Sequence, residues 1–428
     1  MSEPLFSKQT LPGRDDITRH VYANGVTLLT RPNFSSPAVV VRGYLPVGAV
    51  SNPTEKLGLA AFVASCLMTG TSQHDFRSLN DLIESLGASL SFSAGVLSTN
   101  FAGQCLLEDL PTLLALITEV LSQPTFPERQ ANRLRAQILT ALDIQAQNTA
   151  DQADETFDKL FYAAHPYALP GNGTPQSIRA ITLDNLKNFH ANYFSPLELV
   201  ISVVGGVKPD DAIRMVDNTL GAWQKTASQQ QPELPPFTPP AKSLRGHVAL
   251  KAKSQTDLIV GTLAPATMGE EFNIASLGNN ILGVFGMMGR IGENVREKSG
   301  LAYYAQSVLS NGLGPVPWQV VAGVNPDNLG RAIDLILDEL RRFTSEPVSE
   351  EELDDSRTQM IGRLPLSFET NSATAQALLN LERYKLDFDY YRDLPDILAK
   401  ITPQQILEVA RHYWQLDRLV ITSSGRAL

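Results

Sequence analysis

The chain has 428 residues, of which 43% are hydrophobic and 19% charged, a composition that suits two globular domains of about 200 residues each. Its net charge of −10 argues against a surface for nucleic acid or for an anionic membrane. No apolar run approaches the ~20 residues that cross a membrane, and the first ten residues lack the basic and apolar regions of a secretory signal, so we expect a cytoplasmic protein.

The first half is expected to open with strands and to continue with helices. Residues 26–30 and 39–45 are rich in β-branched side chains, which is typical of strands. Residues 110–121 and 127–142 have the apolar spacing of helices. Residues 181–205 are predicted to form a Thr-capped helix followed by a strand that ends in glycine.

The second half repeats this order after a segment rich in Gln and Pro, residues 223–243, which we interpret as an extended linker. Strands are expected at residues 247–251 and 258–263. Helices are expected at residues 329–340 and 349–364. Residues 283–292 are rich in glycine but lack the spacing of a phosphate-binding loop, so nucleotide binding is not indicated.

The chain contains an internal duplication. Residues 401–425 match residues 181–205 without a gap at an offset of 220, and Tyr193 falls on Tyr413. We therefore predict two homologous domains, residues 1–222 and 244–428, joined by the linker 223–243. The expected fold class is α+β, with each domain a mainly antiparallel sheet that has helices packed on one face.

Residues 58–71, GLAAFVASCLMTGT, resemble the segment of pitrilysin/insulinase-type (M16) peptidases that carries the zinc motif HxxEH. In that motif two His at i and i+4 share a helix face and bind Zn²⁺, and the Glu acts as general base. Here Ala61 and Ser65 replace the histidines and Ala64 replaces the glutamate. The family's third ligand, a Glu further along the chain, aligns with Ala141, although Asp143 lies two residues away.

We expect no zinc site elsewhere in the chain. Its six histidines include no pair at ligand spacing on one helix, so surface or capping roles are favoured for them. Cys66 and Cys105 lie in apolar surroundings and are expected to be buried free thiols. No cofactor is therefore expected to bind this chain.

Residues 295–304, VREKSGLAYY, resemble the second signature of the same family, its Arg/Tyr motif. We predict a helix over residues 291–299, Gly300 as the residue that ends it, and a strand over 301–309. The resemblance implies that Arg296 and Tyr303 hold the substrate backbone and stabilise the oxyanion of peptide hydrolysis. Ordinary structural roles for both residues are the alternative, and Tyr304 is expected on the opposite strand face.

Members of this family form a clam-shell of four homologous domains, from one long chain or from two chains of about this length. The resemblance therefore implies a heterodimer in which an HxxEH-bearing homologue binds zinc and cleaves peptides, while this chain holds and orients them through Arg296 and Tyr303. A structural or peptide-binding subunit with no part in proteolysis is the alternative. A homodimer of the isolated chain also stays open. An enzyme with its own chemistry finds no Ser/His/Asp or Cys/His support.

Overall fold

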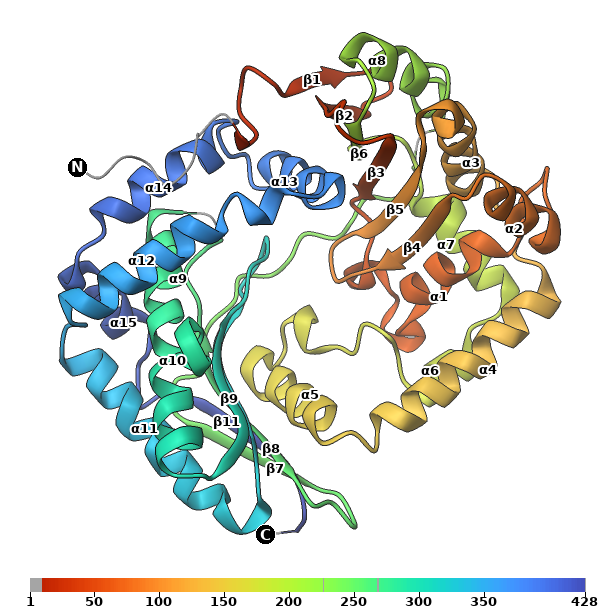
Figure 1. Ribbon diagram of the computed structural model, residues 1–428. Coiled ribbons are helices and arrows are strands. Elements are labelled where there is room, and N and C mark those ends of the chain that lie inside the picture. The colour runs from red at the N-terminus through yellow and green to blue at the C-terminus, as the bar shows by residue number, and fades with distance from the viewer. Residues whose placement is uncertain (1–9, 226, 268, 428) are drawn as a thin grey trace.

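The computed structural model describes residues 10–225, 227–267 and 269–427, apart from the side chain of residue 287, and contains two mixed sheets (Figure 1). The first sheet has the order β1-β2-β6-β3-β5-β4. Its strands are β1 (Thr18–Val21), β2 (Thr27–Pro32), β3 (Ala38–Leu45), β4 (Ser89–Ala94), β5 (Thr99–Leu106) and β6 (Val200–Gly205). Only the β2–β6 pair is parallel among these strands.

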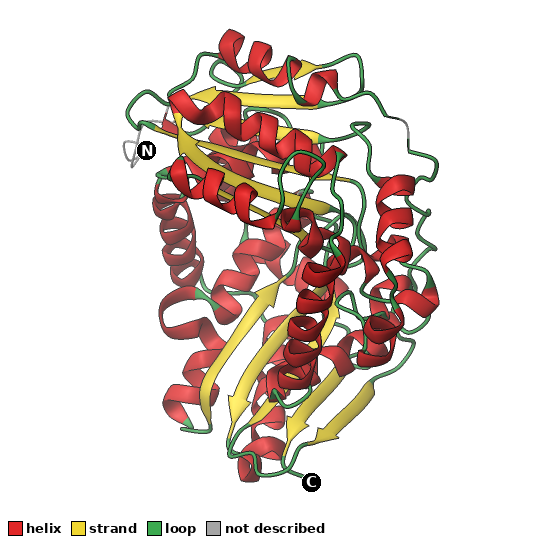
Figure 2. Cartoon of the chain, turned by 90° about the vertical axis from the view of Figure 1, so that its right-hand side faces the viewer, coloured by secondary structure: helices red, strands yellow, loops and turns green. Residues whose placement is uncertain are grey.

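The second sheet has the order β7-β11-β8-β10-β9. Its strands are β7 (Leu244–Ala249), β8 (Thr256–Leu263), β9 (Ala302–Leu309), β10 (Pro317–Val324) and β11 (Val420–Gly425). The β7–β11 pair is parallel and the other described pairs are antiparallel. Both sheets therefore share one strand order and one set of strand directions, with β1 as an addition to the first, and Figure 2 shows them as separate layers.

The helices follow the same repeat. Those of the first half are α1 (Leu59–Cys66), α2 (Phe76–Ser85), α3 (Leu110–Ser122), α4 (Glu128–Gln145), α5 (Thr149–Tyr162), α6 (Pro175–Ala180), α7 (Leu183–Tyr193) and α8 (Pro209–Asp217). Those of the second half are α9 (Glu270–Gly283), α10 (Phe285–Gly292), the π-helix η8 (Glu293–Lys298), α11 (Leu329–Ser345), α12 (Glu350–Arg363), α13 (Asn371–Arg383), α14 (Tyr390–Lys400) and α15 (Pro403–Tyr413). Short 3-10 turns lie at Ala49–Ser51, Thr54–Lys56, Leu67–Thr69, Leu107–Asp109, Pro166–Ala168, Leu220–Ala222, Pro326–Asn328 and Leu366–Phe368.

The duplicated helix–strand units agree in detail. Helices α7 and α15 each begin with a capping box, formed by Thr182 with Asn185 and by Thr402 with Gln405. Their last residues, Tyr193 and Tyr413, keep the offset of 220, and so do the bounds of β6 and β11. The local rules that start and end these elements therefore act in the same way in both halves.

The central strands are buried on both faces, and their side chains alternate between two clusters. In β6, Ile201 and Val203 join the main core under α1, α3 and α7, whereas Val200 and Val204 point to the other face. A strand of this kind needs cover on both sides, because each face presents apolar side chains to its surroundings. The predicted arrangement, with helices packed on one face, leaves the second face of each sheet without a helix.

Each second face is covered by a helix from the other half of the chain. Helix α13 packs on β3 and β6, where Leu378 joins the cluster of Val200 and Val204. Helix α5 packs on β11, β8 and β7, where Phe157 joins the cluster of Ile259 and Val420. The two halves thus exchange equivalent helices, as the positions of α5 and α13 in Figure 1 illustrate.

Polar contacts fix the exchanged helices in place. Asn371 Nδ2 donates to the Ala38 carbonyl of β3 at 2.8 Å, and Arg19 forms two hydrogen bonds to Glu382 at 2.8 and 3.1 Å. On the other side, Thr422 Oγ1 of β11 donates to the Ala153 carbonyl of α5 at 2.9 Å. Each exchanged helix is therefore held by its backbone or its side chains as well as by apolar packing.

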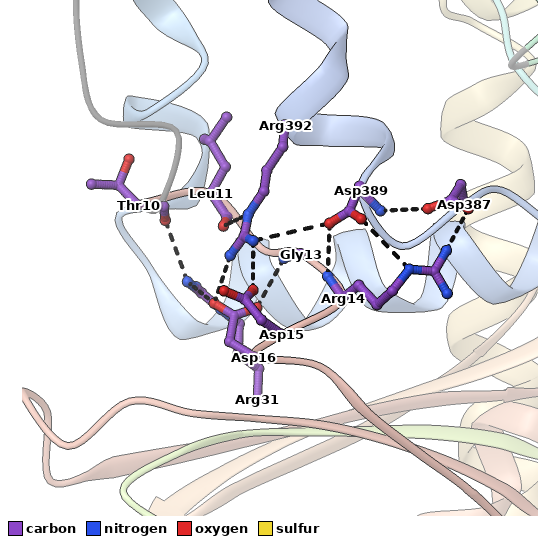
Figure 3. A network of polar contacts seen from close by, with 10 residues as sticks. All are labelled: Thr10, Leu11, Gly13, Arg14, Asp15, Asp16, Arg31, Asp387, Asp389 and Arg392. Carbon is purple, nitrogen blue, oxygen red and sulfur yellow. Dashed lines mark hydrogen bonds and ion pairs between the residues drawn. The ribbon is translucent and has the colours of Figure 1, made fainter.

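A network of ion pairs adds a further link between the halves (Figure 3). Arg392 of α14 contacts Asp15 at 2.5 Å and Asp16 at 3.5 Å, and its Nε donates to the Leu11 carbonyl at 3.0 Å. Gly13 leaves room for this guanidinium, because a Cβ at that position would lie 2.1 Å from Arg392 Cζ. Arg14 in turn reaches Asp387 at 2.5 Å. The described start of the chain is thereby tied to the second half.

The segment 223–243 contains no helix or strand among its described residues, which fits an extended connection. It is nevertheless packed. The ring of Phe237 lies 5.1 Å from that of Phe161 and 5.7 Å from that of Tyr162, both in α5, measured between ring centroids. The division into domains at 222 and 244 stays a prediction. Because of the helix exchange, neither half covers the second face of its own sheet.

Candidate functional site

The positions of the zinc motif lie on α1, which begins after Gly58. This residue has φ +86°, and a Cβ there would lie 2.7 Å from the Asn172 carbonyl, so glycine is required by the backbone and by the close approach of the 171–174 loop. On the helix, Ser65 is exposed and its Oγ donates to the Ala61 carbonyl at 2.9 Å. Ala64 is 2% exposed. Its methyl group fills space in the core rather than facing solvent.

Ala141, the position that aligns with the family's third ligand, does not complete a zinc site. Helix α4 packs on α1, and Arg135 lies over the ring of Phe62 at 5.1 Å. Ala141 and Asp143 are both exposed on α4. Across the described residues, no three His, Cys, Asp or Glu side chains are grouped so that they would hold a metal ion. The donor set of this region therefore does not fit the zinc that an HxxEH motif binds.

Several histidines make structural contacts instead. The Nε2 of buried His190 lies 2.8 Å from the Leu121 carbonyl, and burial lowers the pKa of His190 to about 4. His165 caps the turn at Pro166–Ala168 by accepting from the Tyr167 amide, and burial lowers its pKa as well. His74 lies 3.0 Å from Glu119. Cys66 and Cys105 are buried free thiols, as predicted, and burial raises both pKa values to about 12.

The residues of the Arg/Tyr signature lie at a helix-to-strand junction in the second half. Helix α10 continues as the π-helix η8, and Gly300 follows with φ +63°, the left-handed conformation expected for the end of a helix. The Gly300 amide donates to the Arg296 carbonyl at 2.9 Å. Arg296 therefore lies in the last turn, and Tyr303 follows on β9. The predicted order of helix, glycine and strand is correct, although the helical part is wound as a π-helix.

Both side chains of the signature reach solvent. The Arg296 side chain is 33% exposed and its Nε lies 3.6 Å from Glu297, a weak pairing for two partly exposed groups. Glu293 pairs instead with Lys298 at 2.8 Å. Tyr303 is 66% exposed, which is unusual for a large aromatic side chain on a strand. A guanidinium and a phenol are thus available on adjoining elements.

Tyr304, which follows Tyr303 on β9, has a different environment. The Tyr304 hydroxyl donates to Asp257 Oδ1 at 2.6 Å, and Asp257 is only 3% exposed. The same carboxylate accepts from Thr149 of the exchanged helix α5. Burial, followed by the contact with Asp257, raises the pKa of Tyr304. The two tyrosines therefore have different environments, at a point where the β9–β10 register shifts between Gly323 and Val324. The opposite strand faces expected for them stay a prediction.

A buried polar cluster, which none of the sequence patterns predicts, supports η8. Asn294 Nδ2 donates to Glu339 Oε2 of α11 at 2.6 Å, and Glu339 is 2% exposed. Arg290 makes two hydrogen bonds of 2.7 Å to Glu352, whose pKa falls to about 2. One signal is visible in hindsight: Glu339 occupies the apolar face of α11 beside Ile336, Leu340 and Phe343.

Two family models match this chain, that of insulinase (peptidase family M16) over residues 28–172 and that of the peptidase M16 inactive domain over residues 180–360. The chain belongs to peptidase family M16. Among similar M16 structures, a peptidase M16 inactive domain from Pseudomonas fluorescens has a TM-score of 0.90 at 25% identity, and the match covers 96% of this chain and 98% of that one. A protease from Helicobacter pylori has a TM-score of 0.88 at 17% identity over 97% and 100%.

Curated relatives are similar to this chain at a comparable level of sequence identity. An uncharacterized zinc protease of Streptomyces coelicolor is 23% identical, over 93% of this chain and 87% of its own length. A protein of Helicobacter pylori that is 24% identical, over 87% and 85%, is named a non-peptidase homolog. In the described part of this M16 chain, none of the helices has the length and apolar character needed to span a bilayer.

Proposed function

We propose that this chain is the non-catalytic subunit of a heterodimeric M16 zinc metallopeptidase. One observation carries the proposal. Arg296 and Tyr303 are both accessible to solvent on adjoining elements, whereas the zinc-motif positions Ala61, Ala64 and Ser65 offer no ligand. The match of residues 180–360 to the M16 inactive domain supports this reading. The zinc belongs, in this proposal, to a partner of the same family that carries HxxEH.

The two side chains have a chemical role that needs no metal in this chain. A partner's zinc would supply the chemistry that activates water for peptide hydrolysis, and negative charge would develop on the peptide carbonyl oxygen. A guanidinium and a phenol aimed at that oxygen stabilise the transition state more than the substrate. Loss of one such donor typically raises the barrier by about 3 kcal/mol, which lowers the rate about a hundredfold.

The test is steady-state kinetics on the reconstituted pair of chains. Arg296→Ala and Tyr303→Phe in this chain are each expected to lower kcat about a hundredfold with the partner's zinc content unchanged. Lys298→Ala is the matched control for the arginine, because Lys298 lies in the same π-helix, is 63% exposed and is paired with Glu293. It should leave kcat within about twofold of the wild type.

Other outcomes separate the roles. A rise in KM alone would mean that Arg296 and Tyr303 hold the peptide in its ground state only. Wild-type rates for both variants would refute their part in catalysis. One tightly bound zinc per isolated chain, measured by mass spectrometry, would refute the non-catalytic assignment itself.

A structural or peptide-binding subunit is the second candidate, favoured by the name of one relative, a non-peptidase homolog. The two candidates differ in whether a partner's activity depends on Arg296 and Tyr303. The cytoplasmic location and homodimers of the isolated chain stay predictions. Cell fractionation and analytical ultracentrifugation would test them.

A further inference from the structure

A pocket of about 470 Å³ lies where the two halves meet, in a size range that accommodates small ligands and peptide ends. The turn between β4 and β5 lines it from the first half, and the turn between β9 and β10 lines it from the second. The β9–β10 hairpin extends toward the centre of the molecule in Figure 1. The pocket is separate from Arg296, Tyr303 and the zinc-motif positions, none of which lines it.

The ends of the exchanged helices complete this pocket. Tyr162 is the last residue of α5, and Tyr384 directly follows α13. The two tyrosines occupy equivalent positions, because they are 222 residues apart and so are the first residues of the two helices. Tyr44 and Tyr167 also line it. The Tyr162 hydroxyl donates to the Pro315 carbonyl of the opposite turn at 3.0 Å, which fixes one wall. Aromatic rings from both halves therefore surround the space.

The charge of the pocket has one sign. Of the described residues that line it, Arg383 alone is charged, in a chain whose net charge is −10. Its guanidinium contacts neutral groups: Asn100 Oδ1 at 3.1 Å, Ser98 Oγ at 3.3 Å and the face of the Tyr44 ring at 4.1 Å. The adjacent carboxylate, Glu382, is engaged by Arg19 and Lys385.

We infer that this pocket binds the C-terminal carboxylate of a peptide that ends in an apolar side chain. Arg383 offers a half-buried cation without a carboxylate partner in the described part of the chain, and anions are the ligands such a guanidinium binds best. The tyrosine rings, together with exposed Leu313 and Val96 at the rim, supply an apolar surface for the last side chain. This inference does not rest on the proposed function, because no residue of the Arg/Tyr signature takes part.

The occupant is a peptide end rather than an isolated acid because two hairpin turns flank the pocket. The lining follows both turns, over residues 95–98 and 310–313, and is therefore longer than one side chain with its carboxylate. A lining of this length accommodates the residues that precede the C-terminus of a bound peptide. A free carboxylic acid shares the carboxylate but not the peptide backbone. It is therefore the natural competitor in a test.

The test uses fluorescence anisotropy with the full chain and a fluorescein-labelled peptide, Ser-Gly-Ser-Gly-Phe. The peptide with a free C-terminal carboxylate is expected to bind about tenfold more tightly than its C-terminal amide, because a charge-assisted hydrogen bond is lost in the amide. Equal binding of the two peptides, or no binding of either, would overturn the inference. Displacement by 3-phenylpropionate at the concentration at which the unlabelled peptide itself displaces the probe would overturn the peptide as the occupant.

Two variants tie the binding to this pocket. Leu313→Asp introduces a carboxylate at the rim and should weaken binding of the carboxylate peptide about tenfold, whereas Leu366→Asp should not, because Leu366 is equally exposed and lies outside the pocket. Arg383→Gln should abolish the preference for the carboxylate over the amide. Equal effects of Leu313→Asp and Leu366→Asp would place the binding elsewhere. Circular dichroism and thermal unfolding verify the fold of each variant.

Discussion

Tyr303 and Tyr304 are neighbours on β9 that belong to different parts of the molecule. The Tyr303 side chain is 66% exposed, and the Tyr304 hydroxyl donates to the carboxylate of buried Asp257. Asp257 also accepts from Thr149 and from Gln255, so it connects β8 to the start of the exchanged helix α5. Removal of one hydroxyl group therefore has a different consequence at each position.

We expect Tyr304→Phe to lower the free energy of unfolding by about 1.5–3 kcal/mol, because a hydrogen bond to a buried charge is lost. Tyr303→Phe removes the same group from an exposed ring and should change it by less than about 0.5 kcal/mol. Urea unfolding of the two variants measures both values. Equal stability of the two variants would show that the Tyr304–Asp257 contact does not stabilise the fold. Tyr304→Phe is accordingly a stability variant and not a silent control for kinetics.

His190 predicts a dependence of stability on pH. Burial lowers its folded-state pKa to about 4, below the unfolded value near 6.5. The unfolded chain therefore takes up the proton first, and stability present above pH 6.5 is lost as the pH falls toward 4. The full contribution is on the order of 3 kcal/mol. Between pH 7 and 5, the free energy of unfolding should fall more for the wild type than for His190→Gln, as measured by urea unfolding. Equal losses in the two proteins would contradict a lowered pKa of His190 in the folded state.

At the scale of one element, η8 depends on support from α11. Asn294 within η8 donates to Glu339, which is buried and is also paired with Arg342 at 3.3 Å. Glu339→Ala is expected to lower the free energy of unfolding by about 3–5 kcal/mol, because it removes one partner of a buried charged network. Hydrogen exchange should increase first in Glu293–Lys298. Glu350→Ala, an exposed acid at the start of α12, is the control and should change neither quantity; unchanged exchange in η8 would exclude the supporting role.

Local sequence signals predict the elements better than their partners. The Thr caps of α7 and α15 and the glycine after η8 each act within a few residues, so the sequence alone places them. The apolar face of α5, with Ala153, Phe157 and Phe161, shows that the helix is buried but not which sheet covers it. The duplication makes both sheets suitable. The pocket at Arg383 is equally hidden, because its lining comes from segments that only the exchange brings together.

For the whole molecule, the exchange predicts that the two halves depend on each other. A fragment of residues 1–243 lacks α13 and would expose Leu29, Val40 and Val204 on its first sheet. A fragment of residues 244–428 lacks α5 and would expose Ile259 and Val420. We expect each fragment to be aggregation-prone alone and the two to associate into one folded complex when they are produced together.

Size-exclusion chromatography and circular dichroism of the separate and co-produced fragments make this measurement. A full chain cut by a protease between residues 223 and 243 is the matched control, because it contains both exchanged helices and should stay associated. Cooperative unfolding of either fragment alone as a monomer would show that each half folds without the other.

The exchange of α5 and α13 also delays the burial of the first sheet during protein synthesis. The strands of the first sheet are complete once Gly205 has been made, but the helix that covers the second face ends at Arg383. At roughly 5–20 residues per second, that interval lasts on the order of 10 to 35 s. Throughout it, the residues of the first sheet are all present, but the helix that covers their second face is not. In each nascent chain these apolar residues are therefore accessible for a time to a chaperone that binds extended apolar surfaces. Slower translation lengthens that time.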